Sequence, residues 1–318
     1  MTGRRVRPYK KAPKRKRLYK SKYASSKKRE KLTNLAVNIT ALILLAILSV
    51  NIYNSLTDKR VSLVQNKEYI AAMRISYNDF SILRELSSEQ NMDFPQVLAY
   101  YFAENDFFKG IPTVNNEEFL RTGFLNNFRR IQSIYRRSDI EPLESMFRTL
   151  LTEIVYFPIP VNFHGRAFED YVYSDTWGAR RDYGGSRIHL GTDIIDIRNV
   201  RGRIPIVSMT DGRVLHMGWN ELGGFHVGVI SDSRTYYYYA HLYEFAPGLE
   251  LNSRVFAGDL LGFMGDTGYS PIEGTTGNFP VHLHIGIAYN APFTEGMFWI
   301  NPYIFLRNIE SDKVNIVN

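Results

Sequence analysis

The 318-residue sequence contains no cysteine. This absence excludes a disulfide framework, a thiolate zinc site and a cysteine nucleophile, so a bound metal would have to be held by imidazole and carboxylate groups. Lysine is missing between Lys109 and Lys313, which excludes a biotinyl or lipoyl carrier domain there, because such a domain needs an attachment lysine on a turn. No glycine-rich phosphate loop opens a helix, and this argues against a nucleotide-binding fold.

Charge is distributed unevenly along the chain. Residues 1–31 hold 15 of the 39 lysines and arginines and a single acid, Glu30, whereas the remainder has 24 basic and 31 acidic residues. We interpret residues 1–31 as a basic cytoplasmic tail that contacts anionic lipid headgroups. A nucleic-acid-binding arm is the alternative. No nucleic-acid partner is expected, since the basic cluster lies directly beside an apolar segment.

That apolar segment lacks charge altogether from Leu32 to Thr57. About 20 apolar residues span a bilayer, so we predict a transmembrane signal-anchor helix at 32–54, with Tyr53 at the far interface. The excess of positive charge before it predicts a single-pass protein of the cell membrane, with a cytoplasmic amino terminus and everything after the span extracytoplasmic. A cleaved signal peptide is the alternative, although the basic leader is long and no A-x-A-like site follows.

Residues 55–155 indicate an extracytoplasmic helical domain. Apolar side chains recur there at helical spacing, which is typical of a small bundle core. Such a bundle would act as a spacer between the membrane and the next domain. We expect three helices: one from Asp93 and Pro95 to a stop at Gly110 and Pro112, one over 116–136, and one that begins near Pro142.

Beyond Phe157 the sequence changes to short apolar or alternating runs separated by glycine turns. This pattern predicts an antiparallel all-β domain at 156–308, followed by a C-terminal tail at 309–318. The clearest expected strands are 204–209, 212–217, 225–231 and 235–242.

Two pairs of candidate metal ligands lie in this β domain, His189-x-x-x-Asp193 and His282-x-His284. Side chains at i, i+2 and i+4 of a strand share a face, so each pair is expected to project together. Gly191 would let another backbone or a substrate approach closely. Catalytic zinc sites commonly use three His or carboxylate ligands and leave a fourth position open for water.

A further imidazole follows a run of four tyrosines, in the segment Tyr239-Ala240-His241-Leu242. If this segment is a regular strand, His241 shares a face with Tyr237 and Tyr239. The three motifs would then bring four imidazoles and one carboxylate toward one place.

The three motifs resemble the signatures of the lysostaphin or LytM-type zinc metallopeptidases, which cut peptide cross-links in bacterial peptidoglycan. The glycine-rich run 258–270 also resembles the run before that family's last motif, and the resemblance covers about residues 157–308. It implies a LytM-like β fold with glycine-rich hairpins and a zinc metalloendopeptidase acting on peptidoglycan peptides, which the span predicted above would anchor in the membrane. It further implies that one Zn²⁺ is bound by His189, Asp193 and His284, and that His241 and His282 form the catalytic pair.

The sequence departs from the family pattern at 277–281, the segment before His282. This segment is longer and bulkier than the Gly-Pro that usually precedes the last motif, and we expect it to alter the shape of the substrate groove. Outside the motifs, His164, His216 and His226 are interpreted as structural or surface histidines. The alternative function is a non-catalytic extracytoplasmic scaffold that retains the metallopeptidase fold. Degenerate members of the family lose metal ligands, whereas all five expected residues are present here.

Overall fold

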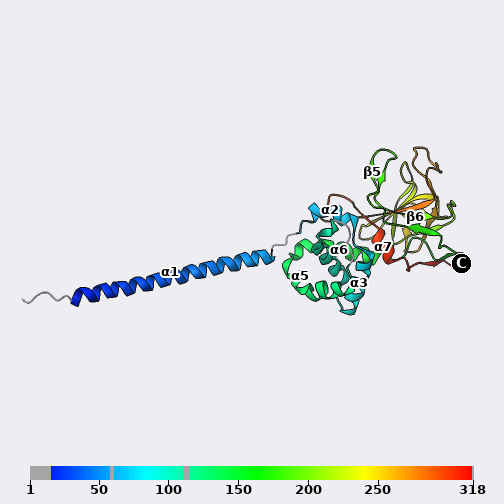
Figure 1. Cartoon of the computed structure of the whole chain (residues 1–318). Coiled ribbons are helices and arrows are strands. Elements are labelled where there is room, and N and C mark those ends of the chain that lie inside the picture. Colours follow the sequence, from blue (N-terminus) through cyan, green and yellow to red (C-terminus); the bar gives the residue numbers. More distant parts are fainter. Residues whose placement is uncertain (1–15, 58–60, 110–114, 317–318) are drawn as a thin grey trace, which may run out of the picture. The chain divides into compact units, whose positions relative to one another are not determined.

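The computed structural model describes residues 16–57, 61–109 and 115–316. The chain separates into two compact units, residues 1–58 and 59–318, and each is described by itself. In its described part the first unit is one long helix, α1 (Lys16–Thr57) (Figure 1).

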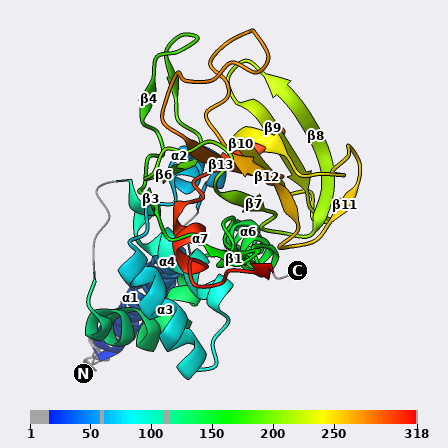
Figure 2. The same cartoon turned by 90° about the vertical axis from the view of Figure 1, so that its right-hand side faces the viewer.

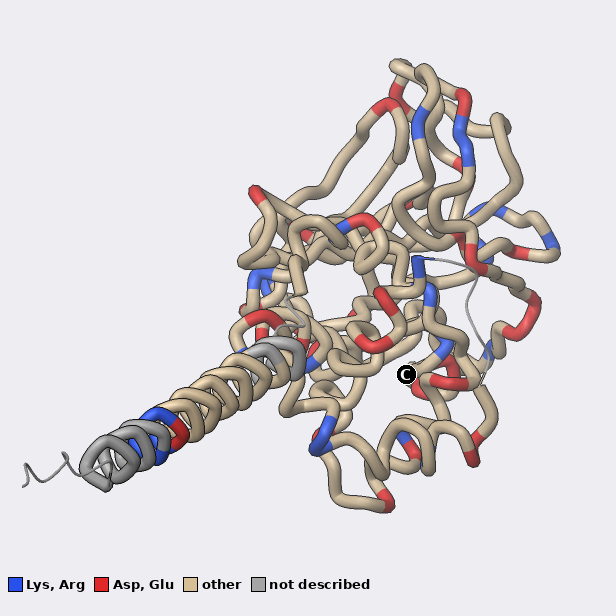
Figure 3. Tube along the Cα trace, turned by 60° about the vertical axis from the view of Figure 1, so that its left-hand side comes forward, with Lys and Arg blue, Asp and Glu red and all other residues tan. Residues whose placement is uncertain are grey.

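Helix α1 carries its charged residues near its start, and an uncharged stretch follows (Figure 3). Its segment Lys27–Val50 is long and apolar enough to cross a membrane, a composition that signal sequences share. Side chains such as Leu42, which is 66% exposed, present an apolar surface that suits lipid better than water. The predicted helix at 32–54 therefore lies within α1, whereas residues 1–15 and the side chain of Tyr53 lie outside what the structure describes.

The second unit begins with a helical part centred on α4 (Phe94–Glu104). Every residue from Val97 to Ala103 is buried, because α4 packs against α6 on one side and α3 on another. The remaining elements of this part are α2 (Leu63–Ala72), α3 (Tyr77–Glu89), η1 (Asp106–Phe108), η2 (Phe119–Phe124), η3 (Leu125–Asn127), α5 (Phe128–Ile134) and α6 (Arg137–Glu153).

The predicted start of α4 is confirmed, with Asp93 at its N-cap and Pro95 in its first turn. The helix ends at Glu104, and the predicted stop at Gly110 and Pro112 lies outside the described residues. The prediction of one continuous helix over 116–136 was wrong, since η2, η3 and α5 replace it. The Asn127 side chain donates to the carbonyls of residues 122 and 123, at 3.2 and 3.1 Å, and so competes with helical backbone bonding.

The third helix also differs from its prediction. It begins at Arg137 rather than near Pro142, and the proline lies inside it. Ile140 is completely buried and extends the apolar stripe formed by Leu143, Met146 and Leu150 toward the start of the helix. Burial of this stripe outweighs the backbone hydrogen bond that the proline cannot donate.

A ten-stranded sheet dominates the rest of the second unit, with the order β11-β8-β9-β10-β13-β6-β3; β12 pairs with β10 and β7, and β14 pairs with β13 (Figure 2). Its strands are β3 (Tyr171–Tyr173), β6 (Thr192–Asp196), β7 (Pro205–Val207), β8 (Gly212–Asn220), β9 (Gly224–Ile230), β10 (Tyr236–Phe245), β11 (Arg254–Val255), β12 (Leu260–Met264), β13 (His282–Tyr289) and β14 (Phe298–Ile300). Its pairings are antiparallel. The predicted antiparallel β fold is therefore confirmed, and the four expected strands correspond to β7, β8, β9 and β10.

Smaller elements complete the second unit. The hairpin of β4 (Arg180–Arg181) and β5 (Arg187–Ile188) forms its own two-stranded sheet. A further sheet joins β1 (Asn162–Phe163), β2 (Arg166–Ala167) and β15 (Asn315–Ile316), so part of the segment after 309 pairs with the β domain. The last helix is α7 (Tyr303–Asn308).

The helical and β parts of the second unit share one hydrophobic core, which runs from Leu63 to Ile309. Asn301 is buried at their junction, where its backbone N–H donates to the Ala71 carbonyl at 2.7 Å and its side chain donates to the Ala72 carbonyl at 3.0 Å. These bonds satisfy carbonyls at the end of α2. The division into domains at 55–155 and 156–308 stays a prediction.

Candidate metal centre and cleft

The register between β6 and β13 places two of the predicted ligands opposite each other. His284 pairs with Asp193, and His282 pairs with Ile195. Directly opposed residues of an antiparallel pair project to the same face with their Cβ atoms about 5 Å apart. Asp193 and His284 therefore meet across the strands, and His282 lies on the same face two residues earlier.

His189 reaches the same point by a different route from the one expected. It lies after the end of β5 and before the start of β6, so the prediction that it shares a strand face with Asp193 was wrong. Its position is fixed instead by backbone bonds, since its N–H donates to the Ala179 carbonyl and its C=O accepts from Gly178, both at 2.8 Å. The chain then bends at Gly191 before β6 begins, and the His189 imidazole contacts the Asp193 carboxylate.

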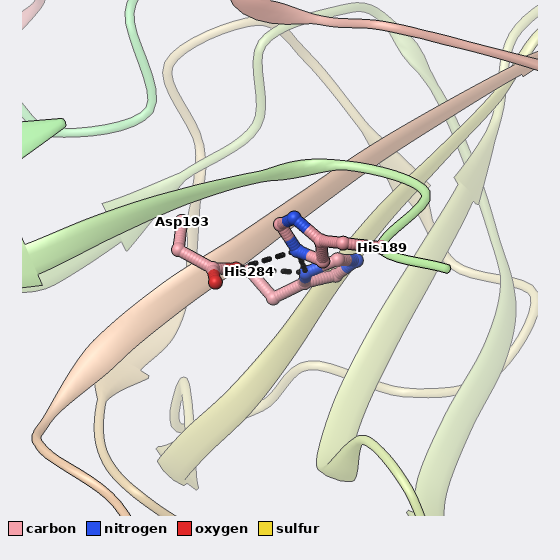
Figure 4. A group of neighbouring side chains, drawn as sticks. All are labelled: His189, Asp193 and His284. Carbon is pink, nitrogen blue, oxygen red and sulfur yellow. Dashed lines mark hydrogen bonds and ion pairs between the residues drawn. The ribbon is translucent and has the colours of Figure 1, made fainter. Parts of the chain in front are cut away.

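The three side chains form a tight triangle (Figure 4). His189 Nε2 lies 3.0 Å from Asp193 Oδ1 and 2.9 Å from His284 Nδ1, and the last two atoms are 2.9 Å apart. Among the described residues these three form the group that could hold a metal ion. With bonds of 2.0–2.1 Å, ligand atoms of a tetrahedral zinc site lie about 3.3 Å apart, a few tenths of an ångström wider than the observed triangle.

The protons available to this triangle are too few for three hydrogen bonds. His189 Nδ1 lies 3.0 Å from the Thr176 carbonyl, to which it can only donate, so in the neutral imidazole Nε2 carries a lone pair. Asp193 Oδ1 also only accepts, and His284 Nδ1 can donate to one neighbour at most. At least two electron-rich atoms therefore face each other, and a shared cation would relieve their repulsion.

Asp193 is held in its charged form. Burial opposes ionisation, but the interactions with the imidazoles of His189 and His284 outweigh it and keep the pKa of Asp193 well below its usual range. Arg181 Nη2 donates to Asp193 Oδ2 at 2.7 Å. The second carboxylate oxygen is thereby occupied, and Oδ1 is directed to the triangle.

The two other motif imidazoles lie beside the triangle. The His241 and His282 rings are 4.6 Å apart between centroids, and His282 Nε2 lies 3.9 Å from Asp193 Oδ1. His241 Nδ1 donates to the Thr267 carbonyl and His282 Nδ1 to the Pro280 carbonyl, both at 2.8 Å. In the neutral state each Nε2 therefore keeps a lone pair. Burial lowers the pKa of both imidazoles.

His241 does not share a face with Tyr237 and Tyr239, contrary to the expectation from a regular strand. Strand β10 has one extra residue relative to β9 between Tyr239 and Leu242, and His241 adopts a φ of +63°. This β-bulge changes the alternation of faces. His241 consequently lines the cleft with Tyr238, whereas Tyr237 and Tyr239 are buried in the core.

The cleft around these groups has a volume of about 500 Å³. Sequence reasoning assigned no role to several of the side chains that line it; they include Arg181, Arg187, Asn220, Tyr238 and Tyr269. His226, predicted to be structural or a surface residue, also lines the cleft. The bulky segment 277–281 contributes Phe279, whose ring lies 4.6 Å from the His241 ring and 5.0 Å from the His282 ring.

Comparison with known proteins is consistent with this geometry. Residues 187–294, which include all five motif residues, match the model of peptidase family M23. A solved structure from Ruminococcus gnavus, assigned as the glycyl-glycine endopeptidase LytM, is 34% identical; the match covers 81% of this chain and 99% of that one, with a TM-score of 0.63. The chain belongs to peptidase family M23.

The M23 assignment confirms the resemblance drawn from the three motifs. The L-Ala–D-Glu endopeptidase of Bacillus subtilis (strain 168) is 36% identical over 192 residues, which are 60% of this chain and 55% of that protein. This chain thus spans about half the length of that relative.

Gly191 is confirmed as a point of close approach and gives a test of the centre. A Cβ atom there would lie 2.4 Å from the Ile285 carbonyl oxygen and 2.5 Å from His284 Cε1. We expect Gly191→Ala to displace His284, to lower the bound metal per chain and to cost about 1–3 kcal/mol of unfolding free energy. Metal analysis and thermal denaturation measure these effects.

Gly123→Ala is the matched control, since its added methyl group would meet only the Phe119 ring at 3.4 Å. Full metal content and unchanged stability of Gly191→Ala would contradict the packing described here.

Proposed function

We propose that this chain is a membrane-anchored zinc endopeptidase that hydrolyses peptide bonds of bacterial peptidoglycan. One observation carries the proposal: three ligand atoms face each other at 2.9–3.0 Å with too few protons between them, in a cleft that holds two further imidazoles. Membership of a peptidase family supports the reaction class. A non-catalytic scaffold is disfavoured because none of the five motif residues is missing.

His189, Asp193 and His284 would hold one Zn²⁺, a metal that accepts imidazole and carboxylate ligands. When bound, the ion supplies Lewis-acid chemistry, which activates a water and polarises the scissile carbonyl. The Thr176 carbonyl fixes the His189 ring, and Arg181 fixes the Asp193 carboxylate. Such supporting contacts orient ligands and are as necessary as the ligands themselves.

His241 and His282 would transfer the proton of the attacking water. Both Nδ1–H groups are committed to backbone carbonyls, so a neutral ring presents an acceptor at Nε2. One ring takes the proton of the attacking water there and becomes a donor, which can then protonate the leaving amine nitrogen. A ring that carries a proton on Nε2 can also donate to the developing oxyanion.

For the bond that is cut, the Bacillus subtilis relative offers the most direct suggestion. Its name states cleavage between L-Ala and D-Glu. We extend this specificity to the present chain as part of the proposal, because the two proteins are 36% identical over 192 residues. Peptidoglycan stem peptides contain such a bond.

Helix α1 would serve as the anchor. Its charge-free segment and the basic residues before it support a cytoplasmic tail at 1–31 and a span at 32–54. The tail would contact anionic lipid headgroups. The helical domain at 55–155 and the peptidase domain at 156–308 would then lie outside the cell membrane, where peptidoglycan is found.

Substitutions at His284 and His282 distinguish a metal ligand from a proton carrier. His284→Ala should lose bound zinc and activity together, because it removes one vertex of the triangle. His282→Ala should keep about one zinc per chain and lose hydrolysis by about 10²–10⁴-fold, the usual contribution of a positioned acid or base. Metal analysis and release of soluble peptides from purified peptidoglycan measure both.

His164→Asn is the matched control, since His164 is exposed and belongs to no motif. Equal zinc content in the variants at 282 and 284 would overturn the assignment of roles. A wild-type protein that binds no zinc and releases no fragments would favour the scaffold.

The pH dependence follows from the buried imidazoles. Burial, followed by repulsion from His282 and His284, holds the pKa of His241 well below 6.5, and burial also lowers the pKa of His282. A lowered pKa keeps the neutral, proton-accepting form at neutral pH and loses it only on acidification. We therefore expect kcat/KM to stay level as pH falls to 6.5 and to decline below that value; a decline centred above 6.5 would contradict this.

The anchor is tested by fractionation and protease protection. We expect the full chain to stay with membranes through an alkaline wash, because a spanning helix is held by lipid and not by charge. Protease added outside should digest residues after the span and spare an amino-terminal tag. Appearance of a soluble, shortened protein would instead indicate a cleaved signal peptide.

A further inference from the structure

Arg187 lies in the catalytic cleft without an acidic partner. Its side chain is half-buried and lines the same cleft as the metal triangle. Its contacts are with tyrosines: Nη2 donates to the Tyr269 hydroxyl at 2.8 Å, and Nε approaches the Tyr183 carbonyl at 3.4 Å. No aspartate or glutamate within the described ranges forms an ion pair with it. A guanidinium is always charged, so this cation has no anion of its own.

The hairpin that carries Arg187 places a second arginine beside it. Arg187 pairs directly with Arg181 across β4 and β5, and directly opposed side chains share one face. Arg181 is neutralised by Asp193, at 2.7 Å. Like charges in opposed positions destabilise a hairpin. Within the described part of the chain, only Arg181 of this pair has a carboxylate partner, so a second carboxylate, bound to Arg187, would complete the arrangement.

The Arg187 guanidinium is held in place before any ligand arrives. It stacks over the Tyr269 ring at 5.3 Å from the centroid. Tyr269 is itself held by two aromatic contacts. Its ring stacks on Tyr183, with centroids 4.6 Å apart and planes within 6°, and it contacts the Phe279 ring edge-on, with centroids 4.8 Å apart. A preorganised guanidinium loses little side-chain freedom when it binds a planar anion.

We propose that Arg187 binds a free carboxylate of the substrate next to the scissile amide. This inference rests on the proposed function and adds to it a specificity-determining residue, which recognises a free carboxylate on the leaving side of the peptide. In stem peptides the D-Glu residue continues through its γ-carboxyl, so its α-carboxylate is free and is attached to the carbon that bears the scissile nitrogen. Arg187 lines the same cleft as the metal triangle and lies opposite Arg181, which contacts Asp193, so a substrate bound there would bring that group to its guanidinium.

The test compares two synthetic peptides that differ at one group. Both have the sequence acyl-L-Ala-γ-D-Glu-L-Lys, and in the second the α-carboxylate of D-Glu is replaced by a carboxamide. With the full-length protein in detergent and loaded with zinc, we expect kcat/KM to be about 10- to 100-fold higher for the carboxylate, the usual effect of a charge-assisted hydrogen bond. Chromatography of the released fragments measures both rates.

Arg187→Gln should remove this preference by slowing cleavage of the carboxylate peptide while cleavage of the carboxamide peptide stays nearly unchanged. Arg187→Lys, which keeps the charge but not the planar fork, should keep part of the preference. The matched control is Arg180→Gln, because Arg180 lies on the same hairpin, is exposed, pairs with Ile188 and forms its own ion pair with Asp182. Its preference should equal that of the wild type.

The outcomes separate this inference from the proposed function. If the wild type cleaves both peptides at equal rates, the function stands and the role of Arg187 is wrong. If Arg187→Gln slows both peptides equally at unchanged zinc content, Arg187 only supports the structure. If the wild type cleaves neither peptide, the proposed function fails, and calorimetric binding then decides: tighter binding of the carboxylate peptide, lost in Arg187→Gln, supports the carboxylate site, and equal binding overturns it.

Discussion

The pairing of β6 with β13 is the constraint on which the centre depends. It sets His284 opposite Asp193 and leaves His282 two residues away on the same face. A slip of one residue would send the side chains of one strand to the other face, so the ligand atoms would no longer meet. Gly191 permits this register, because the path from His189 to Asp193 passes so close to Ile285 and His284 that a side chain has no room.

Loop carbonyls determine how the imidazoles can act. The Nδ1 atoms of His189, His241 and His282 donate to the carbonyls of Thr176, Thr267 and Pro280. The Nε2 atoms of these three rings are thereby left as lone-pair donors to a metal or acceptors of a proton. His284 is different, since its Nδ1 faces the triangle. The strands thus set where the His241, His282 and His284 rings lie, and the loop carbonyls set which nitrogen of a neutral His189, His241 or His282 ring carries the proton.

Much of the fold and the identity of the candidate groups could be predicted from the sequence. Alternating patterns located β7 to β10, and the motif spacing singled out the five residues that meet in the cleft. These features could be predicted because a strand pattern depends on residues close together in the sequence, and a motif depends on residue type and spacing. The β fold and the family resemblance were accordingly confirmed.

Features that depend on distant partners could not be predicted. Nothing in the tyrosine run indicates the bulge that turns His241 to the cleft, because the extra residue is defined only against β9. The position of His189 depends on backbone bonds to residues 178 and 179. Likewise, the sequence alone does not indicate which arginine lines the cleft. Only the pairing of β4 with β5 distinguishes Arg187 in the cleft from Arg180 in solvent.

The helical part of the second unit contacts the buried face of the sheet that carries the cleft. The carboxylate of Glu153, at the end of α6, accepts hydrogen bonds from Ser231 at 2.9 Å and Tyr237 at 3.4 Å. Tyr237 lies on the buried face of β10, and the neighbouring Tyr238 lies on the cleft face. The end of α6 is thus hydrogen-bonded to the strand that carries His241. The helices are therefore part of the core on which the β domain and its cleft are built.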